Sequence, residues 1–253
     1  MRHFPMCPDC QQEYATPDDR RFHSQTNTCA TCGMQVWLRE EKKKITEAPL
    51  TQAIKHLQGG KIIAVRSPSG YLLCADARRP DTLQRLRRHK HRPHKPFALL
   101  YPSLEQVCGD FHPSKAEAQA LDSPLAPIVL LSADPETLPF AAAEVAPNLR
   151  QFGVMLPASS LLFLLSQQMG TPLVATSGNR HDSPILAEPK EAHTHLHDLA
   201  DGFLEHNLPI TFPQDDTVMR FADEHPILLR RARAGSELSQ TAAGIGTRTG
   251  YGC

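Results

Sequence analysis

Two Cys-x-x-Cys pairs place the strongest constraint on how the N-terminal part of this 253-residue chain can fold. The pairs are Cys7 with Cys10 and Cys29 with Cys32, and 18 residues separate them. Each pair can present two thiolates to one tetrahedral ion, and the intervening length suits a small, loop-rich module closed by zinc. A thioredoxin-like redox pair would need a strand followed by a helix, and that pattern surrounds neither pair. We therefore predict a zinc module over residues 1–38, in which His23 could replace a thiolate or orient one.

The overall composition excludes several classes of protein. The chain has 27 Lys and Arg residues against 27 Asp and Glu residues, so its formal net charge is zero and any preference for anions must be local. No apolar run reaches the roughly 18 residues that a membrane span requires, and the N-terminus does not resemble a signal peptide. We expect a soluble, cytoplasmic protein that does not bind membranes.

The pattern of apolar segments predicts an α/β domain over residues 49–235. Residues 39–48 are charged and lack an apolar period, which is typical of a linker, and residues 236–253 read as a disordered tail. Expected helices begin near Pro49 and Pro80 and span residues 160–169 and about 188–199. Expected strands are 61–66, 71–75, 97–100, 127–131, 152–156, 172–176, 216–221 and 227–231. Because helices and strands alternate, we predict one twisted, mixed sheet flanked by helices.

A cationic segment between an expected helix and an expected strand indicates an anion site. The cations are Arg87, Arg88, Lys90, Arg92 and Lys95. A charge run is usually a solvated face, but a second polar loop, residues 176–179, directly follows another apolar run. In open α/β sheets, ligands bind beyond the carboxyl ends of strands, where cations, hydroxyls and amides could meet a phosphate.

These two loops resemble the signature of the YrdC family, whose members make acyl-adenylates from ATP. The matching residues are Lys90-x-Arg92, Lys95-Pro96 and Thr176-Ser177-Gly178-Asn179. More narrowly, the chain is similar to the HypF family, the carbamoyltransferases of [NiFe]-hydrogenase maturation. Further matching segments are residues 4–10, 18–23, 73–77, 127–131, 153–157 and 215–220. Together they extend the resemblance over residues 4–233.

The resemblance implies a YrdC-like α/β fold behind a zinc finger, and it implies roles for individual residues. The expected zinc ligands are Cys7, Cys10, Cys29 and Cys32. The expected catalytic residues are Lys90 and Arg92, and the expected ligands of ATP and carbamoyl phosphate are Lys90, Arg92, Lys95, Ser177, Asn179 and Arg233. Zinc would be structural, and ATP would enter with Mg²⁺ as a substrate.

The resemblance also implies a shortened HypF that makes carbamoyl-adenylate. HypF proteins contain an acylphosphatase domain, a second finger and a transferase module that this sequence lacks. Hydrogenase-maturation proteins would be its partners.

Other interpretations stay open. HypF proteins usually show a lysine and a glycine-rich turn where this chain has Arg66-Ser67-Pro68-Ser69, and the change could narrow the pocket or remove a backbone donor. The family's other activity, synthesis of threonylcarbamoyl-adenylate for tRNA modification, is the alternative enzyme. A double-stranded RNA-binding module without catalysis is the alternative of another class. His193, His195 and His197 fan around a helix at a period of two, which indicates a solvated face rather than a metal site.

Overall fold

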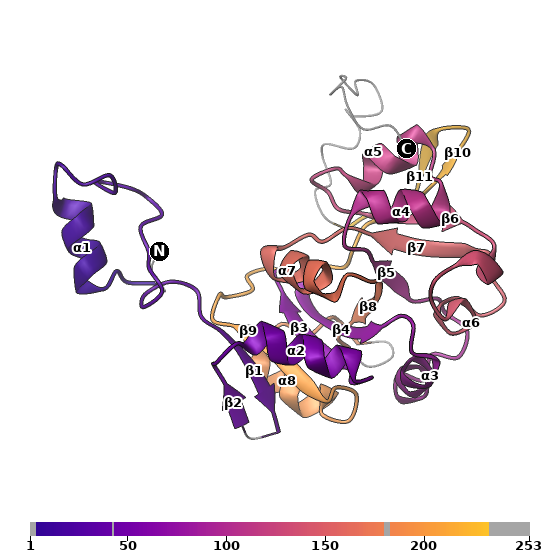
Figure 1. Ribbon diagram of the computed structural model, residues 1–253, viewed down its shortest axis with the longest axis horizontal. Helices are drawn as coiled ribbons and strands as arrows, with labels where there is room; N and C mark the ends of the chain where they lie inside the picture. Colours follow the sequence, from indigo (N-terminus) through magenta and orange to yellow (C-terminus); the bar gives the residue numbers. More distant parts are fainter. Residues whose placement is uncertain (1–3, 42, 180–182, 233–253) are drawn as a thin grey trace.

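One mixed sheet forms the body of the protein. The computed structural model describes residues 4–41, 43–179 and 183–232 (Figure 1). Within these residues the sheet has 11 strands in the order β11-β10-β6-β7-β5-β8-β4-β3-β9-β1-β2. The strands are β1 (Val36–Glu40), β2 (Lys43–Ile45), β3 (Ile63–Ser67), β4 (Gly70–Asp76), β5 (Ala98–Leu100), β6 (Ile128–Ser132), β7 (Gln151–Met155), β8 (Leu173–Ser177), β9 (Gly202–His206), β10 (Val218–Ala222) and β11 (His225–Arg230). The pairs β3–β9, β5–β7 and β6–β10 are parallel and the other pairs are antiparallel, so the predicted mixed α/β sheet is confirmed.

Helices begin and end where the sequence supplies caps. They are α1 (Pro8–Ala15), α2 (Pro49–Gln58), α3 (Pro80–His89), α4 (Leu104–Phe111), α5 (Lys115–Leu121), the 3₁₀ turn η1 (Pro135–Thr137), α6 (Ala142–Val145), α7 (Ser160–Met169) and α8 (Pro189–Leu196). Proline occupies the first turn of α1, α2, α3 and α8, where its missing N–H costs no helical bond. Ser103, Ser114 and Ser159 cap α4, α5 and α7 with their hydroxyls, and Gly170 ends α7 in the left-handed region. None of the helices in the described ranges is long and apolar enough to cross a membrane.

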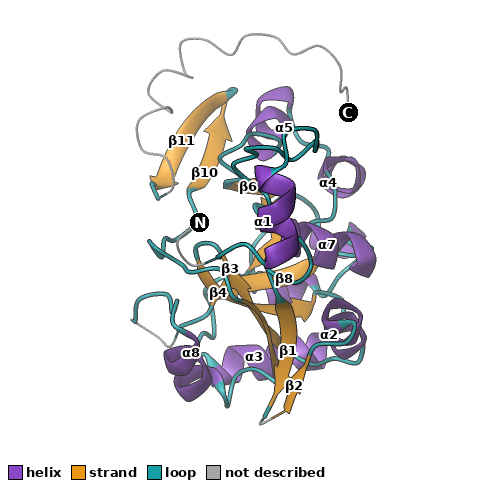
Figure 2. Cartoon of the chain, turned by 90° about the vertical axis from the view of Figure 1, so that its left-hand side faces the viewer, coloured by secondary structure: helices purple, strands orange, loops and turns teal. Residues whose placement is uncertain are grey.

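The sheet buries apolar residues on both of its faces. Successive residues of β3 alternate between the two cores, with Ala64 on one face and Ile63 and Val65 on the other. Helices α3 and α8 cover the first face, while α2 and α7 cover the second. In Figure 2, α2 and α7 lie to the right of strand β1 and α8 lies to its left. Apolar residues buried in two layers, one on each face of the sheet, therefore stabilise this domain.

The predicted linker over residues 39–48 is wrong, because part of that segment belongs to the sheet. Strand β1 pairs with β9 and with β2, and Leu38 of β1 is fully buried. Of the charges that suggested a linker, Arg39 and Glu40 end β1, whereas Lys43 and Lys44 lie on the edge strand β2, where exposed lysines are common because they hinder pairing with another chain. Lys44 Nζ also lies 3.9 Å from the centre of the Trp37 ring. The sheet thus starts at Val36, ahead of the expected domain boundary at residue 49. The expected tail at 236–253 lies outside the described residues.

Candidate functional site

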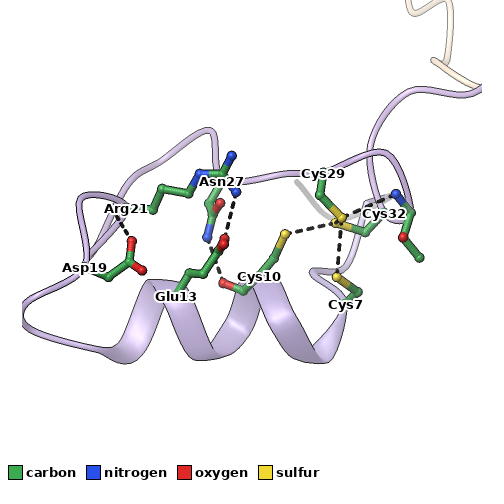
Figure 3. Close-up of polar contacts among 9 residues, drawn as sticks. Cys7, Cys10, Glu13, Asp19, Arg21, Asn27, Cys29 and Cys32 are labelled. Carbon is green, nitrogen blue, oxygen red and sulfur yellow. Dashed lines mark hydrogen bonds and ion pairs between the residues drawn. The ribbon is translucent and has the colours of Figure 1, made fainter.

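Four cysteine thiols converge in the N-terminal module. The Sγ atoms of Cys7 and Cys29 are 3.6 Å apart, those of Cys29 and Cys32 are 3.9 Å apart, and those of Cys10 and Cys32 are 3.7 Å apart (Figure 3). Tetrahedral zinc with Zn–S bonds of about 2.3 Å needs sulfurs about 3.8 Å from one another. The four thiols therefore fit one zinc ion as a complete ligand set.

Local backbone structure places these thiols. Cys7 is the N-cap of α1 and Cys10 lies in its first turn, while Asn27 Nδ2 donates to the Cys10 carbonyl at 2.7 Å. Backbone N–H groups, including that of Thr31 at 3.3 Å, point at Cys29 Sγ and lower the pKa of this thiol to about 6. Gly33 is required, because a Cβ there would lie 2.7 Å from the Cys29 carbonyl oxygen. Backbone N–H groups also lower the pKa of Cys32, whereas burial and the neighbouring thiols raise the pKa of Cys10.

His23 does not join the cysteine cluster. Its ring stacks on Tyr14 at 5.1 Å and on Phe22 at 4.1 Å, measured between ring centres. In the part of the chain that the structure describes, the four cysteines are the one group of three or more potential ligands that could hold a metal ion. Of the three histidines in or next to α8, His195 and His197 are exposed, whereas His193 is half-buried and its Nε2 lies 2.9 Å from Glu205 Oε1. Four thiolates, without an imidazole, are the ligand set that the geometry favours.

The two polar loops predicted to share a site lie against each other. Lys90 is the C-cap of α3, and its side chain is buried. Its Nζ donates to the Ser177 carbonyl at 2.6 Å, to the Asn179 carbonyl at 3.0 Å and to Asn179 Oδ1 at 3.2 Å. The cationic segment after α3 is therefore fastened to the loop that follows β8.

Arg92 reaches the same loop from the other side. Its Nη1 donates to Thr176 Oγ1 at 2.9 Å, its Nε donates to the Lys95 carbonyl at 3.1 Å, and its Nη2 donates to the Pro96 carbonyl. The guanidinium carbon lies 5.0 Å from the centre of the Phe97 ring. These contacts leave the planar cation half-buried beside Thr176.

The electrostatics of this pair favour an anion. Burial, together with the nearby charges of Arg92 and Lys95, lowers the pKa of Lys90 to about 7. Burial and the charges of Arg87 and Arg230 likewise lower the pKa of Arg92 to about 10. Among the described residues, no carboxylate forms an ion pair with Lys90 or Arg92. A phosphate at this position would neutralise cations that the protein leaves uncompensated.

Hydrogen bonds hold residues 177–179, at the end of β8, in place. Ser177 Oγ donates to Asn179 Oδ1 at 2.7 Å, and Asn179 Nδ2 donates to the Ser183 carbonyl at 2.6 Å. Gly178 donates its N–H to the Tyr71 carbonyl at 2.6 Å, and a Cβ on Gly178 would lie 2.7 Å from that carbonyl oxygen. The glycine is therefore needed for close approach of two backbones, and it fixes where Ser177 and Asn179 lie.

Not every predicted residue takes the expected place. Lys95 is exposed, and Arg233 lies outside the described residues. Arg87, one of the clustered cations, is structural: it donates to the carbonyls of Glu144, Val145, Arg92 and Lys95, and its guanidinium lies over Phe97 at 4.4 Å.

Sequence reasoning missed one cation near the site. Arg230 is close enough to lower the pKa of Arg92, and its Nε donates to the Asp216 carbonyl at 2.8 Å. The cluster Arg230-Arg231-Ala232-Arg233 is a signal in the sequence for a cation here, but the residue predicted from it was Arg233, its last arginine.

The unusual segment 66–69 forms a tight turn between β3 and β4. Ser67 Oγ donates to the Gly70 carbonyl at 2.7 Å and lies 3.1 Å from Ser69 Oγ. Gly70 has a φ of 130°, and a Cβ there would clash with Ile185. The two serines therefore stabilise the turn in place of a glycine-rich sequence.

Comparison with known proteins matches both parts of the chain. The HypF finger model matches residues 6–39, and the Sua5/YciO/YrdC model, described as telomere recombination, matches residues 55–232. The carbamoyltransferase HypF of Rhodobacter capsulatus is 40% identical over 236 residues, which are 92% of this chain and 31% of that protein. The threonylcarbamoyl-AMP synthase of Bacillus subtilis is 26% identical over 188 residues, 72% of this chain and 52% of that protein.

A solved structure is similar over nearly the whole chain. The crystal structure of full-length HypF in its phosphate- and nucleotide-bound form has a TM-score of 0.81 and 36% identity, and the match covers 92% of this chain and 30% of that one. This chain thus spans about a third of the length of the HypF proteins that it matches. The four cysteines fall within the finger match, and Lys90, Arg92, Ser177 and Asn179 fall within the other match.

Proposed function

The chain belongs to the Sua5/YciO/YrdC family and carries a HypF finger before that domain, and from this premise we propose that it converts ATP and carbamoyl phosphate to carbamoyl-adenylate. The reaction would serve [NiFe]-hydrogenase maturation, with the proteins of that process as partners and the cytoplasm as its location. The finger would bind structural zinc.

The chemistry matches what the site offers. Water would first break the phosphate bond of carbamoyl phosphate, so that inorganic phosphate leaves and carbamate remains. A carbamate oxygen would then attack the α-phosphorus of ATP, the bond from that phosphorus to the pyrophosphate oxygen would break, and pyrophosphate would leave. Such a reaction needs cations that hold and neutralise phosphates, and a pocket that keeps water from the mixed anhydride. Mg²⁺ bound to the nucleotide would supply further neutralisation.

Individual side chains would divide this work. Lys90 and Arg92 would bind the phosphates, in contact with the reacting groups, and Ser177 and Asn179 would bind the nucleotide through hydroxyl and amide groups. The Lys90 ammonium, which donates to three oxygens of the 177–179 loop, would exchange part of these bonds for phosphate oxygens. Lys95, Arg230 and Arg233 are weaker members.

One observation carries the proposal: Lys90 and Arg92, which form no ion pair with a carboxylate of the described residues, contact the polar loop at the end of β8. The match to HypF over 92% of the chain favours carbamoyl as the activated group. The Bacillus subtilis relative keeps threonylcarbamoyl-adenylate synthesis as the second enzyme candidate. The same cations would also suit a double-stranded RNA backbone.

Exchange of labelled pyrophosphate into ATP separates these candidates. The protein is incubated with ATP and Mg²⁺, with carbamoyl phosphate in one arm and with threonine plus bicarbonate in the other. Exchange that depends on carbamoyl phosphate is the expected result, and exchange that depends on threonine would favour the second enzyme. Absence of both, with RNA binding that weakens steeply as salt increases, would favour the binding module.

A further inference from the structure

We propose that Glu205 is a positioning residue for the 177–179 loop, and that it acts through Tyr71. The part of this inference that concerns ATP rests on the proposed function. The part that concerns the loop itself rests on contacts that the structure shows. None of the four residues involved, Glu205, Tyr71, His193 and Trp37, belongs to the predicted site.

Glu205 is a fully buried carboxylate with donors on both of its oxygens. Oε1 accepts from the Tyr71 hydroxyl and lies 2.9 Å from His193 Nε2. Oε2 accepts from Trp37 Nε1 at 2.9 Å and lies 3.6 Å from Arg39 Nε. A buried carboxylate is costly unless donors and positive charge surround it. The partners come from β1, β4 and α8, so this one carboxylate joins three elements that are distant in sequence.

Tyr71 carries this attachment to the candidate site. Its N–H donates to the Leu186 carbonyl at 2.8 Å, and its carbonyl accepts from Gly178 N–H at 2.6 Å. Leu186 N–H in turn donates to the Gly178 carbonyl at 3.1 Å. The backbone of Tyr71 thus holds both Gly178, in the 177–179 loop, and Leu186, which follows that loop.

The side chain of Tyr71 decides where that backbone lies. Its ring is fully buried and meets Phe203 edge to face at 6.4 Å. Burial, together with the hydrogen bond to Glu205, raises the pKa of Tyr71, so the phenol stays a donor. Gly178 N–H donates to the Tyr71 carbonyl and approaches Tyr71 so closely that a Cβ would not fit, so a shift of Tyr71 would be passed on to Gly178 and its neighbour Asn179. Asn179 is a contact of Lys90, which completes the connection from Glu205 to the phosphate-binding cation.

The same carboxylate connects the site to the zinc finger. Strand β1 follows Cys32 after three residues, and its Trp37 donates to Oε2 while Tyr71 donates to Oε1. Glu205 therefore holds the strand that leaves the finger and the strand that seats the 177–179 loop.

A matched pair of tyrosine variants tests the role of the Tyr71 hydroxyl. Tyr71 and Tyr101 are both fully buried, and each donates its hydroxyl to a carboxylate, Glu205 for Tyr71 and Asp110 at 2.7 Å for Tyr101. Tyr71→Phe and Tyr101→Phe thus remove the same kind of bond, but Tyr71 alone of the two contacts Gly178. Hydrogen exchange of the Gly178 and Leu186 amides is measured in both variants and in the wild-type protein.

We expect Tyr71→Phe to speed exchange at both amides roughly tenfold, the factor that loss of about one hydrogen bond implies. Tyr101→Phe should leave these amides as in the wild type even where the melting temperature falls equally. The proposal would be overturned if the Gly178 and Leu186 amides exchanged at the same rate in Tyr71→Phe as in Tyr101→Phe, because the Tyr71 hydroxyl would then contribute only to overall stability.

Substitutions of Glu205 add a test by conservative rescue. Glu205→Gln keeps an oxygen that accepts from Tyr71, whereas Glu205→Leu removes both acceptors, so exchange at the two amides should increase far less in the first variant. Equal exchange in these two variants, both folded, would contradict the assigned role. If Glu205→Leu does not fold, the tyrosine pair still decides the matter.

Nucleotide binding separates this inference from the proposed function. The Kd of ATP should increase severalfold in Tyr71→Phe, whereas in Tyr101→Phe it should stay at the wild-type value. Altered exchange at Gly178 in a protein that binds no ATP would leave the positioning role standing and would sink the proposed function.

Discussion

The finger and the sheet domain are stabilised in different ways. Over residues 4–35 only Cys10, Asn27 and Gly33 are buried, whereas the domain from Val36 onward buries two apolar layers. A module of this size cannot bury enough apolar surface to fold, so metal binding must supply its folding free energy. In the domain, Lys90 is buried and Arg92 is half-buried, and among the described residues neither forms an ion pair with a carboxylate. The finger thus uses its cysteine thiols for folding, whereas the domain leaves Lys90 and Arg92 available to a ligand.

The largest expected effect is unfolding of the finger while the domain stays folded. Replacing Cys7 and Cys10 by Ser should remove the metal, about one zinc per chain in the wild type, and should unfold residues 4–35. Hydrogen exchange should show that the backbone amides of the finger lose their protection completely, whereas those of β3, β4 and β8 keep it. Cys74→Ala is the matched control, because Cys74 is a buried thiol of the core outside the cluster and its variant should keep the zinc. Wild-type protein without zinc, prepared without chelator, would contradict the comparison.

The next effect tests whether the cations of the domain serve a ligand. Arg92→Ala should weaken ATP binding roughly 10- to 100-fold, since charge-assisted hydrogen bonds to phosphate are lost. Calorimetric titration measures the affinity. Arg88→Ala is the control, because Arg88 is an exposed arginine near the end of α3, four residues before Arg92, and its loss should change the affinity little. An Arg92→Ala protein that is unfolded under the conditions of the titration would show that Arg92 belongs to the structure and not to the site.

The buried lysine predicts a dependence on pH. The pKa of Lys90 lies near 7, so its positive charge is present below that pH and is lost as the pH rises above it. ATP affinity should therefore fall by about tenfold between pH 6 and pH 9, equivalent to one pKa unit of differential interaction. Lys90→Met removes this titration and leaves that of the nucleotide itself, so the difference between the two pH profiles isolates the lysine. Parallel profiles for the wild type and the variant would rule out this role for Lys90.

The smallest expected effect concerns the exposed member of the predicted set. The Lys95 side chain is exposed, and solvent and salt screen its charge. Lys95→Ala should weaken ATP binding only about twofold in physiological salt. A tenfold loss in the same titration would mean that bound nucleotide draws Lys95 into the site.

The sequence predicted the elements with clear local signals. Apolar runs predicted β3 to β8, β10 and β11, and the Cys-x-x-Cys spacing predicted the thiol cluster. The two polar loops were expected to meet because each lies next to the end of an expected strand. Local patterns could not show that β1 and β2 join the sheet, since a charged edge strand and a charged linker have the same composition. They also missed β9 and its Glu205.

Other residues took roles that depend on contacts distant in the sequence. Arg87 and Lys90 belong to the same cationic run, yet Arg87 donates to the carbonyls of Glu144 and Val145, whereas Lys90 donates to Ser177 and Asn179. Glu205 meets Tyr71 and Trp37 across 134 and 168 residues of sequence. No periodicity within one segment contains that information, because it depends on which strands become neighbours.

Direct detection of the adenylate tests the central proposal. The protein is mixed with ATP, Mg²⁺ and carbon-labelled carbamoyl phosphate, the reaction is stopped within one turnover, and adenylates and pyrophosphate are separated and counted. We predict carbon label on the adenylate in amounts equal to the released pyrophosphate, with both strongly reduced in Arg92→Ala. Pyrophosphate release that requires threonine and bicarbonate, with no label transferred from carbamoyl phosphate, would contradict the proposal.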